Sequence, residues 1–288
     1  MIRLPGTPVA AERWADVPRL AAAVTWLAGP GAVTALLASR AGRPRRAERR
    51  WAGWARRLLG LRVDLRGLEH VDPTRRYVVA PLHEAYVDPI VLLSLPLRLR
   101  FVGRDVVTSS WPVSAAMAAG GHLSVRPERP VEAYRRMLRW ADTLGSGDSA
   151  VVFPQGTLLG IEAAFSDGAF RLAERLDAPL LPVVISGTHR VWERPFSPVV
   201  RFGRRVWVEV LPPVRPEEAM GGREEVERRM RAAALAAPVA PRRYEPDRDG
   251  WWDGYRFAIH DDFPDLAARV AERRSRPGSA DAAGRAHP

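Results

Sequence analysis

His83 and Asp88 have the residue types and spacing of a general base and the carboxylate that orients it. An apolar stretch ends at Pro81, so His83 falls in the loop that follows, and Asp88 lies near the start of a helix. A carboxylate placed there can reach back to one imidazole nitrogen, which fixes the tautomer and leaves the other nitrogen free as a base. The structural alternative is that His83 packs in its loop and Asp88 caps its helix.

A second polar stretch runs Gly120-Gly-His-Leu-Ser-Val-Arg126. Two glycines lead into a predicted strand, with Arg126 near its end. An arginine in this place can clamp a phosphate through two hydrogen bonds. The open alternative is a surface ion pair, and we expect the nearby His122 to be structural.

A third stretch, Phe153-Pro-Gln-Gly-Thr157, ends a buried strand and has no titratable side chain. Gly156 permits close approach of the backbone to a ligand, and Thr157 can donate or accept a hydrogen bond. The open alternative is an ordinary turn after a strand.

These stretches belong to a region in which predicted strands and helices alternate. Strands are expected at 77–81, 99–104, 122–125, 149–153, 180–186 and 206–211, and helices at 87–95, 109–119, 130–144, 168–176 and 216–237. This alternation indicates an α/β domain, residues 62–240, with a mostly parallel central sheet flanked by helices. Residues 241–276 form an extension with an aromatic cluster at 251–257 that we expect to pack on the core, and the composition of 277–288 predicts disorder.

The N-terminal residues 1–61 have the pattern of a membrane attachment. Residues 20–39 contain no charged side chain and approach the roughly 20 residues that span a bilayer, but Gly29-Pro30-Gly31 interrupts them. We expect two short helices that form a hairpin in one leaflet; a soluble helical pair packed on the core is the open alternative.

The next segment, residues 40–66, carries ten arginines against two acidic residues. Trp51, Trp54, Leu58 and Leu61 recur among them at helical spacing, as in a basic amphipathic helix at a lipid headgroup region. Together with the apolar run, this predicts a peripheral or monotopic protein on anionic phospholipid at the cytoplasmic face of the cell membrane.

The composition narrows the function classes. The 288-residue chain carries a formal charge of +11 and no cysteine, which excludes disulfides, thiolate metal sites and a cysteine nucleophile. All basic residues are arginine, and a coding bias explains part of the charge. The sequence contains no phosphate-binding P-loop, no dinucleotide fingerprint and no metal-ligand spacing. Nucleic-acid binding ranks last, because the arginines cluster beside an apolar segment rather than on a nucleic-acid motif.

The motifs, in this order, resemble the glycerolipid acyltransferase family that includes 1-acylglycerol-3-phosphate acyltransferases, the PlsC-like enzymes. The family's His-x4-Asp motif is matched by His83 and Asp88, its second motif by Gly120 and Arg126, and its Phe-Pro-Glu-Gly-Thr motif by Phe153, Pro154, Gly156 and Thr157. Phe165–Phe170 and Leu181-Pro182-Val183 resemble two later motifs.

The resemblance implies an O-acyltransferase of phospholipid biosynthesis, with His83 and Asp88 as catalytic residues. It also implies that Arg126, Gln155, Gly156 and Thr157 bind substrate. Acyl-CoA or acyl carrier protein would be the co-substrate, a lysophospholipid the acceptor, and no further cofactor or metal is expected. The alternative is a lipid- or acyl-binding protein on this scaffold with little catalysis.

Five positions depart from the family pattern. Gln155 stands where the family has Glu, Leu158 where an Arg is frequent, and Glu84 where Ser or Asn follows the histidine. In the second motif, Val125 stands where the family has Asp before the Arg, and Leu123 stands where it has an aromatic residue. The family's charges in its second and third motifs are associated with the glycerol phosphate of the acceptor. This chain keeps one cation there, Arg126.

Overall fold

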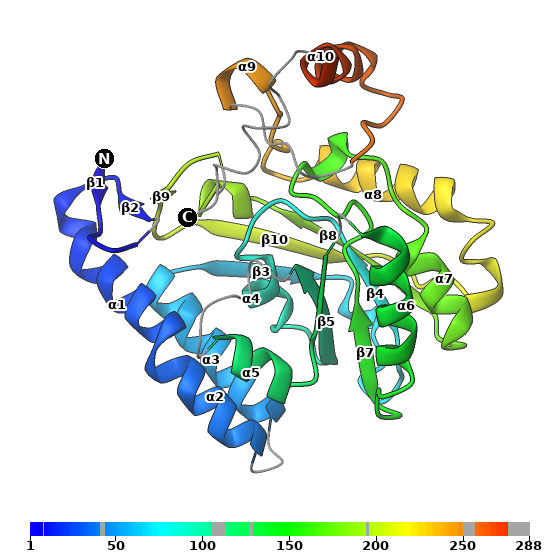
Figure 1. Ribbon diagram of the computed structural model, residues 1–288, viewed down its shortest axis with the longest axis horizontal. Coiled ribbons are helices and arrows are strands. Elements are labelled where there is room, and N and C mark those ends of the chain that lie inside the picture. Colours follow the sequence, from blue (N-terminus) through cyan, green and yellow to red (C-terminus); the bar gives the residue numbers. More distant parts are fainter. Residues whose placement is uncertain are drawn as a thin grey trace.

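A seven-stranded sheet forms the centre of the computed structural model, which describes residues 1–7, 9–40, 44–104, 113–126, 129–193, 196–249 and 257–275 (Figure 1). The strand order is β3-β10-β8-β4-β7-β5-β6, and every neighbouring pair is parallel except β10 with β8. These strands are β3 (Arg62–Arg66), β4 (Val78–Pro81), β5 (Arg98–Arg104), β6 (Leu123–Val125), β7 (Asp148–Val151), β8 (Leu180–Ser186) and β10 (Arg205–Val210). A small second sheet joins β1 (Ile2–Arg3), β2 (Ala10–Ala11) and β9 (Val199–Val200).

Helices cover both faces of the large sheet. They are α1 (Val17–Ala28), α2 (Pro30–Arg40), α3 (Pro44–Leu59), α4 (Asp88–Leu92), α5 (Val113–Ala119), α6 (Pro130–Ala141), α7 (Gly168–Arg175), α8 (Arg223–Ala236), α9 (Pro246–Asp249) and α10 (Pro264–Ser275). One core contains apolar residues of α1, α3 and α4, and the other those of α6, α7 and α8. The predicted α/β class with a mostly parallel sheet is therefore confirmed.

The central strands are apolar because both of their faces are covered. Every residue of β4 and β8 is buried, which is the pattern of strands in the interior of a parallel sheet. The edge strand β3 instead alternates polar and apolar residues, and the sequence did not predict it. β3 is held in the sheet by its pairing with β10, which runs from Arg205 with Arg62 to Glu209 with Arg66.

The N-terminal helices differ from the predicted hairpin. α1 and α2 are separated at Gly29, as expected, but they continue in nearly the same direction, and α3 runs back beside them (Figure 1). The helical hydrogen bonds pass through the break, since the Gly29 N–H donates to the Thr25 carbonyl (2.9 Å) and the Val33 N–H to the Gly29 carbonyl (3.0 Å). Pro30 fits at the first helical position, where no N–H is needed. The hairpin is thus formed by α1–α2 with α3.

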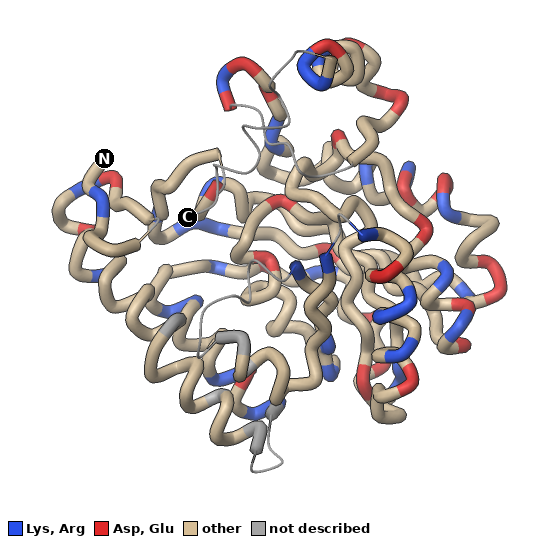
Figure 2. The backbone as a smooth tube through the Cα atoms, viewed as in Figure 1, with Lys and Arg blue, Asp and Glu red and all other residues tan. Residues whose placement is uncertain are grey.

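Residues 14–38 make up a helical stretch of 25 residues that is long and apolar enough to cross a membrane, the one such stretch among the described residues. One of its sides belongs to the protein interior, because Leu20 and Ala23 lie in the main core. α3 buries Ala52, Ala55 and Leu59 rather than its tryptophans. Basic residues are distributed along these helices, as the blue segments of Figure 2 show.

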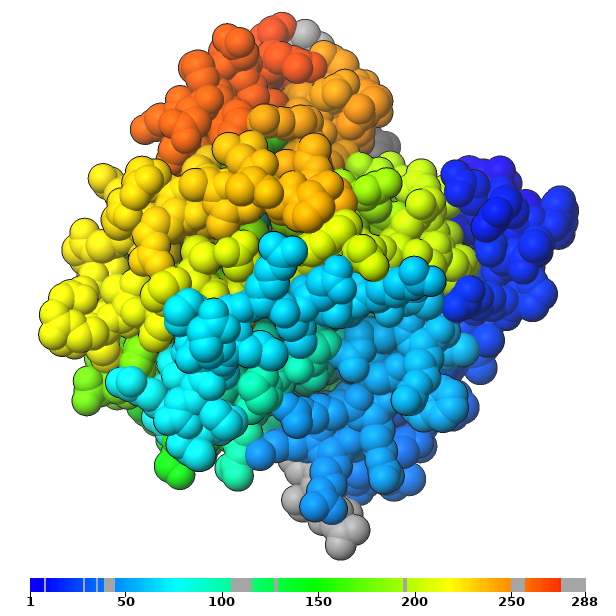
Figure 3. Space-filling view, turned by 180° about the vertical axis from the view of Figure 1, so that it is seen from behind, coloured from blue at the N-terminus to red at the C-terminus, as the bar shows by residue number. Residues whose placement is uncertain are grey.

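The C-terminal extension packs at another end of the molecule, beyond α8 (Figures 1 and 3). Residues 251–256 of the predicted aromatic cluster, and the predicted disordered tail 277–288, lie outside the described residues. The described part forms its own apolar cluster with the segment that follows β7. Its buried members are Leu158, Leu159, Ala163, Tyr244, Phe257, Leu266 and Val270.

Glu162 ties this extension to the domain. It lies in a 3-10 turn, η4 (Gly160–Glu162), and its carboxylate accepts a hydrogen bond from the Tyr244 N–H (2.7 Å). The His260 N–H donates to the Glu162 carbonyl at 2.9 Å. Burial raises the pKa of the Glu162 carboxyl above its ordinary value of 4.5, and the Tyr244 N–H and Arg243 only partly offset that effect.

We predict that Glu162→Gln gains stability over the wild type as the pH rises above about 4.5. A raised folded-state pKa means that the carboxyl favours the fold while protonated and loses that contribution as it ionises. Glutamine cannot ionise but keeps an oxygen for the Tyr244 N–H. Urea unfolding of both proteins between about pH 4.5 and 8 measures the difference.

Glu225→Gln is the control for that experiment, because Arg228 lowers the pKa of the exposed Glu225 carboxyl and gives the opposite sign. If the free energies of unfolding of wild type and Glu162→Gln stay parallel over this range, the assigned direction is wrong.

Candidate active site

The site lies where parallel strands end. β8, β4, β7, β5 and β6 run in one direction, so the segments after them emerge at one edge of the sheet. His83 follows β4, residues 153–157 follow β7, and β4 and β7 are direct neighbours. In open α/β sheets this edge is the usual place for a ligand. The topology therefore joins two motifs that are about 70 residues apart in sequence.

His83 and Asp88 are in direct contact. The His83 Nδ1 and the Asp88 Oδ2 are 2.7 Å apart, and the same oxygen accepts hydrogen bonds from the N–H groups of Glu84 (2.8 Å) and Ala85 (3.0 Å). A carboxylate oxygen only accepts hydrogen bonds, so the His83 Nδ1 is the donor in this contact. The Nε2 of His83 is then the nitrogen left for a substrate.

Two contacts fix the imidazole ring and its main chain. The ring stacks on Phe153, with centroids 3.9 Å apart and an interplanar angle of 25°. The His83 carbonyl accepts a hydrogen bond from the Gly160 N–H at 3.0 Å. The Asp88 side chain is fully buried, whereas 18% of the His83 side chain is exposed. The His83 imidazole is thus accessible, while the Asp88 carboxylate that it contacts is not.

The segment after β7 is a closed turn. The Gln155 Nε2 donates to the Gly160 carbonyl (2.9 Å), and Gln155 is buried. Gly156 has φ +62°, the left-handed conformation that favours glycine, and is exposed. Thr157 is buried. Gln155 therefore joins the two ends of its own loop, and Gly156 presents bare backbone at the surface.

Several buried polar atoms of this region have no hydrogen-bond partner in the described part of the chain. They are Glu84 Oε1, Asp88 Oδ1, Gln155 Oε1 and Thr157 Oγ1. Buried polar atoms in native proteins are normally paired with protein or with ordered water. A site that binds water or a polar ligand needs hydrogen-bonding atoms without a protein partner, and these four oxygens meet that need.

Arg126 lies apart from the other predicted residues. It is exposed and directly follows β6, the edge strand of the sheet. β6 is three strand spacings from β4, about 14 Å at the usual separation of neighbouring strands. Arg126 thus lies at the same edge of the sheet as His83, three strands away from it.

His122 has structural partners. Its Nδ1 accepts a hydrogen bond from the Phe101 N–H (3.0 Å), and its Nε2 lies 3.3 Å from a carboxylate oxygen of Glu48 on α3. The Arg100 guanidinium lies 3.6 Å from the same oxygen. These contacts attach the basic helix α3 to the end of the sheet.

Sequence reasoning missed a second histidine and carboxylate. The Glu84 side chain accepts hydrogen bonds from the Gly187 N–H and the His189 Nδ1, each at 2.9 Å. Both partners follow β8. The available signal was the order strand, glycine, histidine at 180–189, but nothing in it pointed to Glu84.

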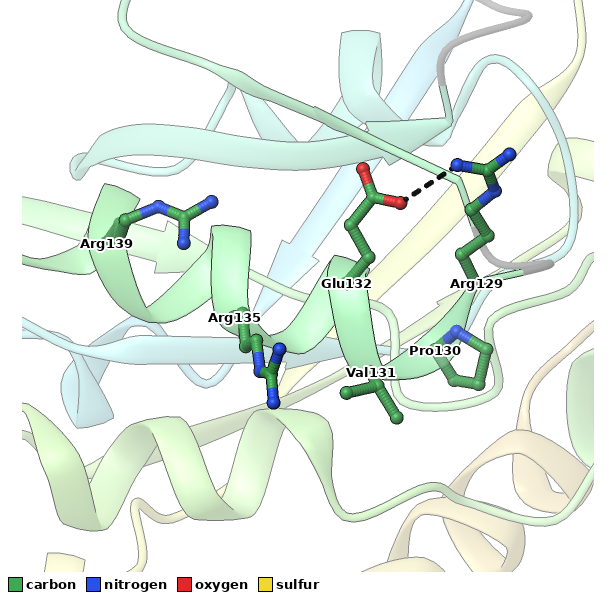
Figure 4. Close-up of a pocket in the computed structure, with 6 residues that line it drawn as sticks. All are labelled: Arg129, Pro130, Val131, Glu132, Arg135 and Arg139. Atoms are coloured by element: carbon green, nitrogen blue, oxygen red, sulfur yellow. Dashed lines mark hydrogen bonds and ion pairs between the residues drawn. The ribbon is translucent and has the colours of Figure 1, made fainter.

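A surface pocket on α6 does not contain these residues. Figure 4 shows its lining by Arg129, Pro130, Val131, Glu132, Arg135 and Arg139, with Arg129 and Glu132 paired at 3.3 Å. It is an exposed basic groove without a histidine among its lining residues, and it shares no residue with the strand-end site.

Comparison with known proteins gives one consistent result. Residues 62–186 match the family model named Acyltransferase. The chain is 33% identical over 169 residues to 1-acyl-sn-glycerol-3-phosphate acyltransferase alpha of Mus musculus, covering 57% of this chain and 58% of that protein. The human protein of the same name is 32% identical over 169 residues, with 56% and 57% covered. The chain thus spans a little over half the length of these relatives.

A solved structure has the same fold. The 1-acyl-sn-glycerophosphate acyltransferase PlsC from Thermotoga maritima aligns with a TM-score of 0.59 and 18% identity, covering 78% of this chain and 99% of that one. The family model covers the strands and loops that carry His83, Asp88, Arg126 and Gln155. Residues 62–186 therefore match the Acyltransferase family, and the resemblance to PlsC-like glycerolipid acyltransferases predicted from the motifs is confirmed.

Proposed function

We propose that the protein transfers a fatty acyl group from acyl-CoA or acyl carrier protein to a hydroxyl of a lysophospholipid such as 1-acylglycerol-3-phosphate. The observation that carries this proposal is the contact between the partly exposed His83 and the buried Asp88 at the strand-end edge. The names of the relatives, which are acyltransferases for 1-acyl-sn-glycerol-3-phosphate, support the acceptor class.

In the proposed reaction the His83 Nε2 takes the proton of the acceptor hydroxyl. The oxygen attacks the thioester carbonyl carbon, and Asp88 stabilises the imidazolium that forms. The tetrahedral intermediate collapses as the C–S bond breaks, and the leaving thiolate takes the proton back from His83. The acyl group passes directly between the two substrates, so the chain needs no nucleophile of its own.

The substrate-binding roles follow from position. Arg126, at the far end of the same edge, takes an anionic group of a substrate. Gly156 offers exposed backbone in the loop after β7, and the buried side chains of Gln155 and Thr157 set the shape of that loop from within. Because Gln155 is bound to its own loop, its effect on the acceptor is largely through the shape of that loop.

We further propose that the N-terminal helices hold the protein on anionic phospholipid, at the cytoplasmic face of the membrane, as a peripheral or monotopic protein. Large apolar side chains are exposed on them: Trp14 (76%), Leu37 (60%) and Trp54 (50%). Exposed arginines of α3 lie nearby in sequence, namely Arg46, Arg49, Arg50 and Arg57. Such a combination suits the headgroup region, and each basic residue adds about 1 kcal/mol near an anionic surface.

The acyl transfer is tested by thiol release from long-chain acyl-CoA and from acyl carrier protein over a lysolipid panel. His83→Ala is expected to lower the rate about 10²–10⁴-fold, the usual contribution of a general base. Asp88→Asn lowers it as well, because the buried carboxylate that stabilises the imidazolium is lost.

The matched control is His70→Ala, a histidine outside the strand-end site, which leaves the rate unchanged. If wild type binds acyl donor or lysolipid but releases no thiol with any pair, the protein is a binding protein on this scaffold. An undiminished rate in His83→Ala would remove the proposed base.

The membrane attachment is tested by flotation with vesicles of phosphatidylglycerol and phosphatidylcholine. The triple variant Trp14→Glu, Leu37→Glu and Trp54→Glu is expected to float poorly, because its exposed apolar side chains are replaced by anions. Leu235→Glu, on α8, is an equally exposed control (58%) and floats as wild type does. Equal flotation of wild type and triple variant would contradict the assignment to these helices.

A further inference from the structure

Glu84 hydrogen-bonds to two loops of the strand-end site and lies beside a third. Its N–H donates to the Asp88 Oδ2 at 2.8 Å, next to the His83 contact in the loop after β4. Its carboxylate accepts the Gly187 N–H and the His189 Nδ1 from the segment after β8. A side chain added at Gly160, in the loop after β7, would lie 3.8 Å from the Glu84 Cγ.

The Glu84 side chain is fully buried and contacts His189 in the described part of the chain. A buried carboxyl group needs hydrogen-bond partners, because removal from water otherwise costs several kcal/mol. The Gly187 N–H and the His189 ring supply them, and His189 is itself nearly buried, with 12% of its side chain exposed. It follows that the site contains two histidine–carboxylate pairs, joined through the peptide bond between residues 83 and 84.

The two pairs differ in what they hold. Asp88 contacts the imidazole that faces a substrate, whereas Glu84 contacts a histidine of a different strand end. The Gly187 N–H comes from a residue in the left-handed conformation (φ +94°), so the turn after β8 is formed around this carboxylate. Through its side chain Glu84 fixes that turn, and through its main chain it fixes Asp88.

We propose that Glu84 and His189 are a positioning pair, which holds the 83–85 main chain against the end of β8 so that two N–H groups and the His83 ring converge on the Asp88 carboxylate. A base must be held within about 0.5 Å of its productive place, and residues behind the reacting groups supply that precision. This role rests on the proposed acyl transfer for its kinetic readout, but the geometry it describes can be measured without turnover.

The pair is tested by His189→Ala, His189→Asn and Glu84→Gln, with His70→Ala as control. Asparagine places an amide N–H close to the position of Nδ1 and so keeps the bond to Glu84, whereas alanine removes it. We expect His189→Ala to lower kcat about 10–100-fold, as losses of such supporting partners do. The KM for the acyl donor should stay within about 2-fold, because the pair does not touch it.

His189→Asn should recover most of the lost kcat, and Glu84→Gln, which keeps shape but not charge, should fall between. The double variant Glu84→Gln/His189→Ala should be no slower than the slower single variant, because both act through one contact. Thermal unfolding identifies any variant that has lost its fold. If His189→Ala does not fold, His189→Asn and Glu84→Gln, which keep the shape of the side chains, still test the pair.

Hydrogen–deuterium exchange supplies the readout that does not depend on activity. The N–H groups of Glu84 and Ala85 donate to Asp88, so a peptide covering residues 82–88 should exchange faster in His189→Ala and recover in His189→Asn. A peptide from α8 should not change. If wild type shows no acyl transfer but this exchange pattern holds, the proposed function fails and the positioning pair stands. Unchanged exchange and kcat in His189→Ala, or equal losses in the alanine and asparagine variants, overturn the pair.

Discussion

The strand-end site depends on the hydrogen bonds that the Asp88 carboxylate accepts. One oxygen of this fully buried group accepts hydrogen bonds from the His83 imidazole and from two successive main-chain N–H groups. A buried anion is tolerated only when it is satisfied in this way, so the loop between β4 and α4 must wrap around it. The same wrapping turns the His83 ring outward, against Phe153, with one nitrogen available.

The parallel sheet extends this local arrangement to the rest of the site. Parallel neighbours β4, β7 and β8 place three loops at one edge, and the loops are then joined by short polar contacts. Gly160 donates to the His83 carbonyl and accepts from Gln155, and Glu84 reaches the turn after β8. The loop after β7 therefore takes part in the site through its backbone and amides, without a charged side chain.

The segments outside the family domain attach to it in two places. α1 and α3 contribute to the main core, while Leu37 of α2 and Trp54 of α3 are left exposed. The C-terminal extension packs on Leu158, Leu159 and Ala163, directly after the loop of Gln155. The segment after β7 is thus joined to the sheet at one end and packed on the extension at the other.

By itself the sequence determined the α/β class, the order of most strands and helices, and the pair His83 and Asp88. These features are local: apolar runs of strand length, helical periodicity, and a carboxylate one turn away from a histidine. The motif order then identified the family. β3 escaped prediction because its stability comes from pairing with β10, and the break at Gly29 did not reveal that α1 and α2 continue in one direction.

Only the tertiary structure decided which polar groups meet. Glu84 and His189 are 105 residues apart, and their contact exists because β4 and β8 are neighbours in the sheet. Strand order is set by the packing of whole layers, which no short stretch of sequence encodes. For the same reason only the structure shows that Arg126 lies three strands away from His83 and that the Gln155 side chain hydrogen-bonds within its own loop.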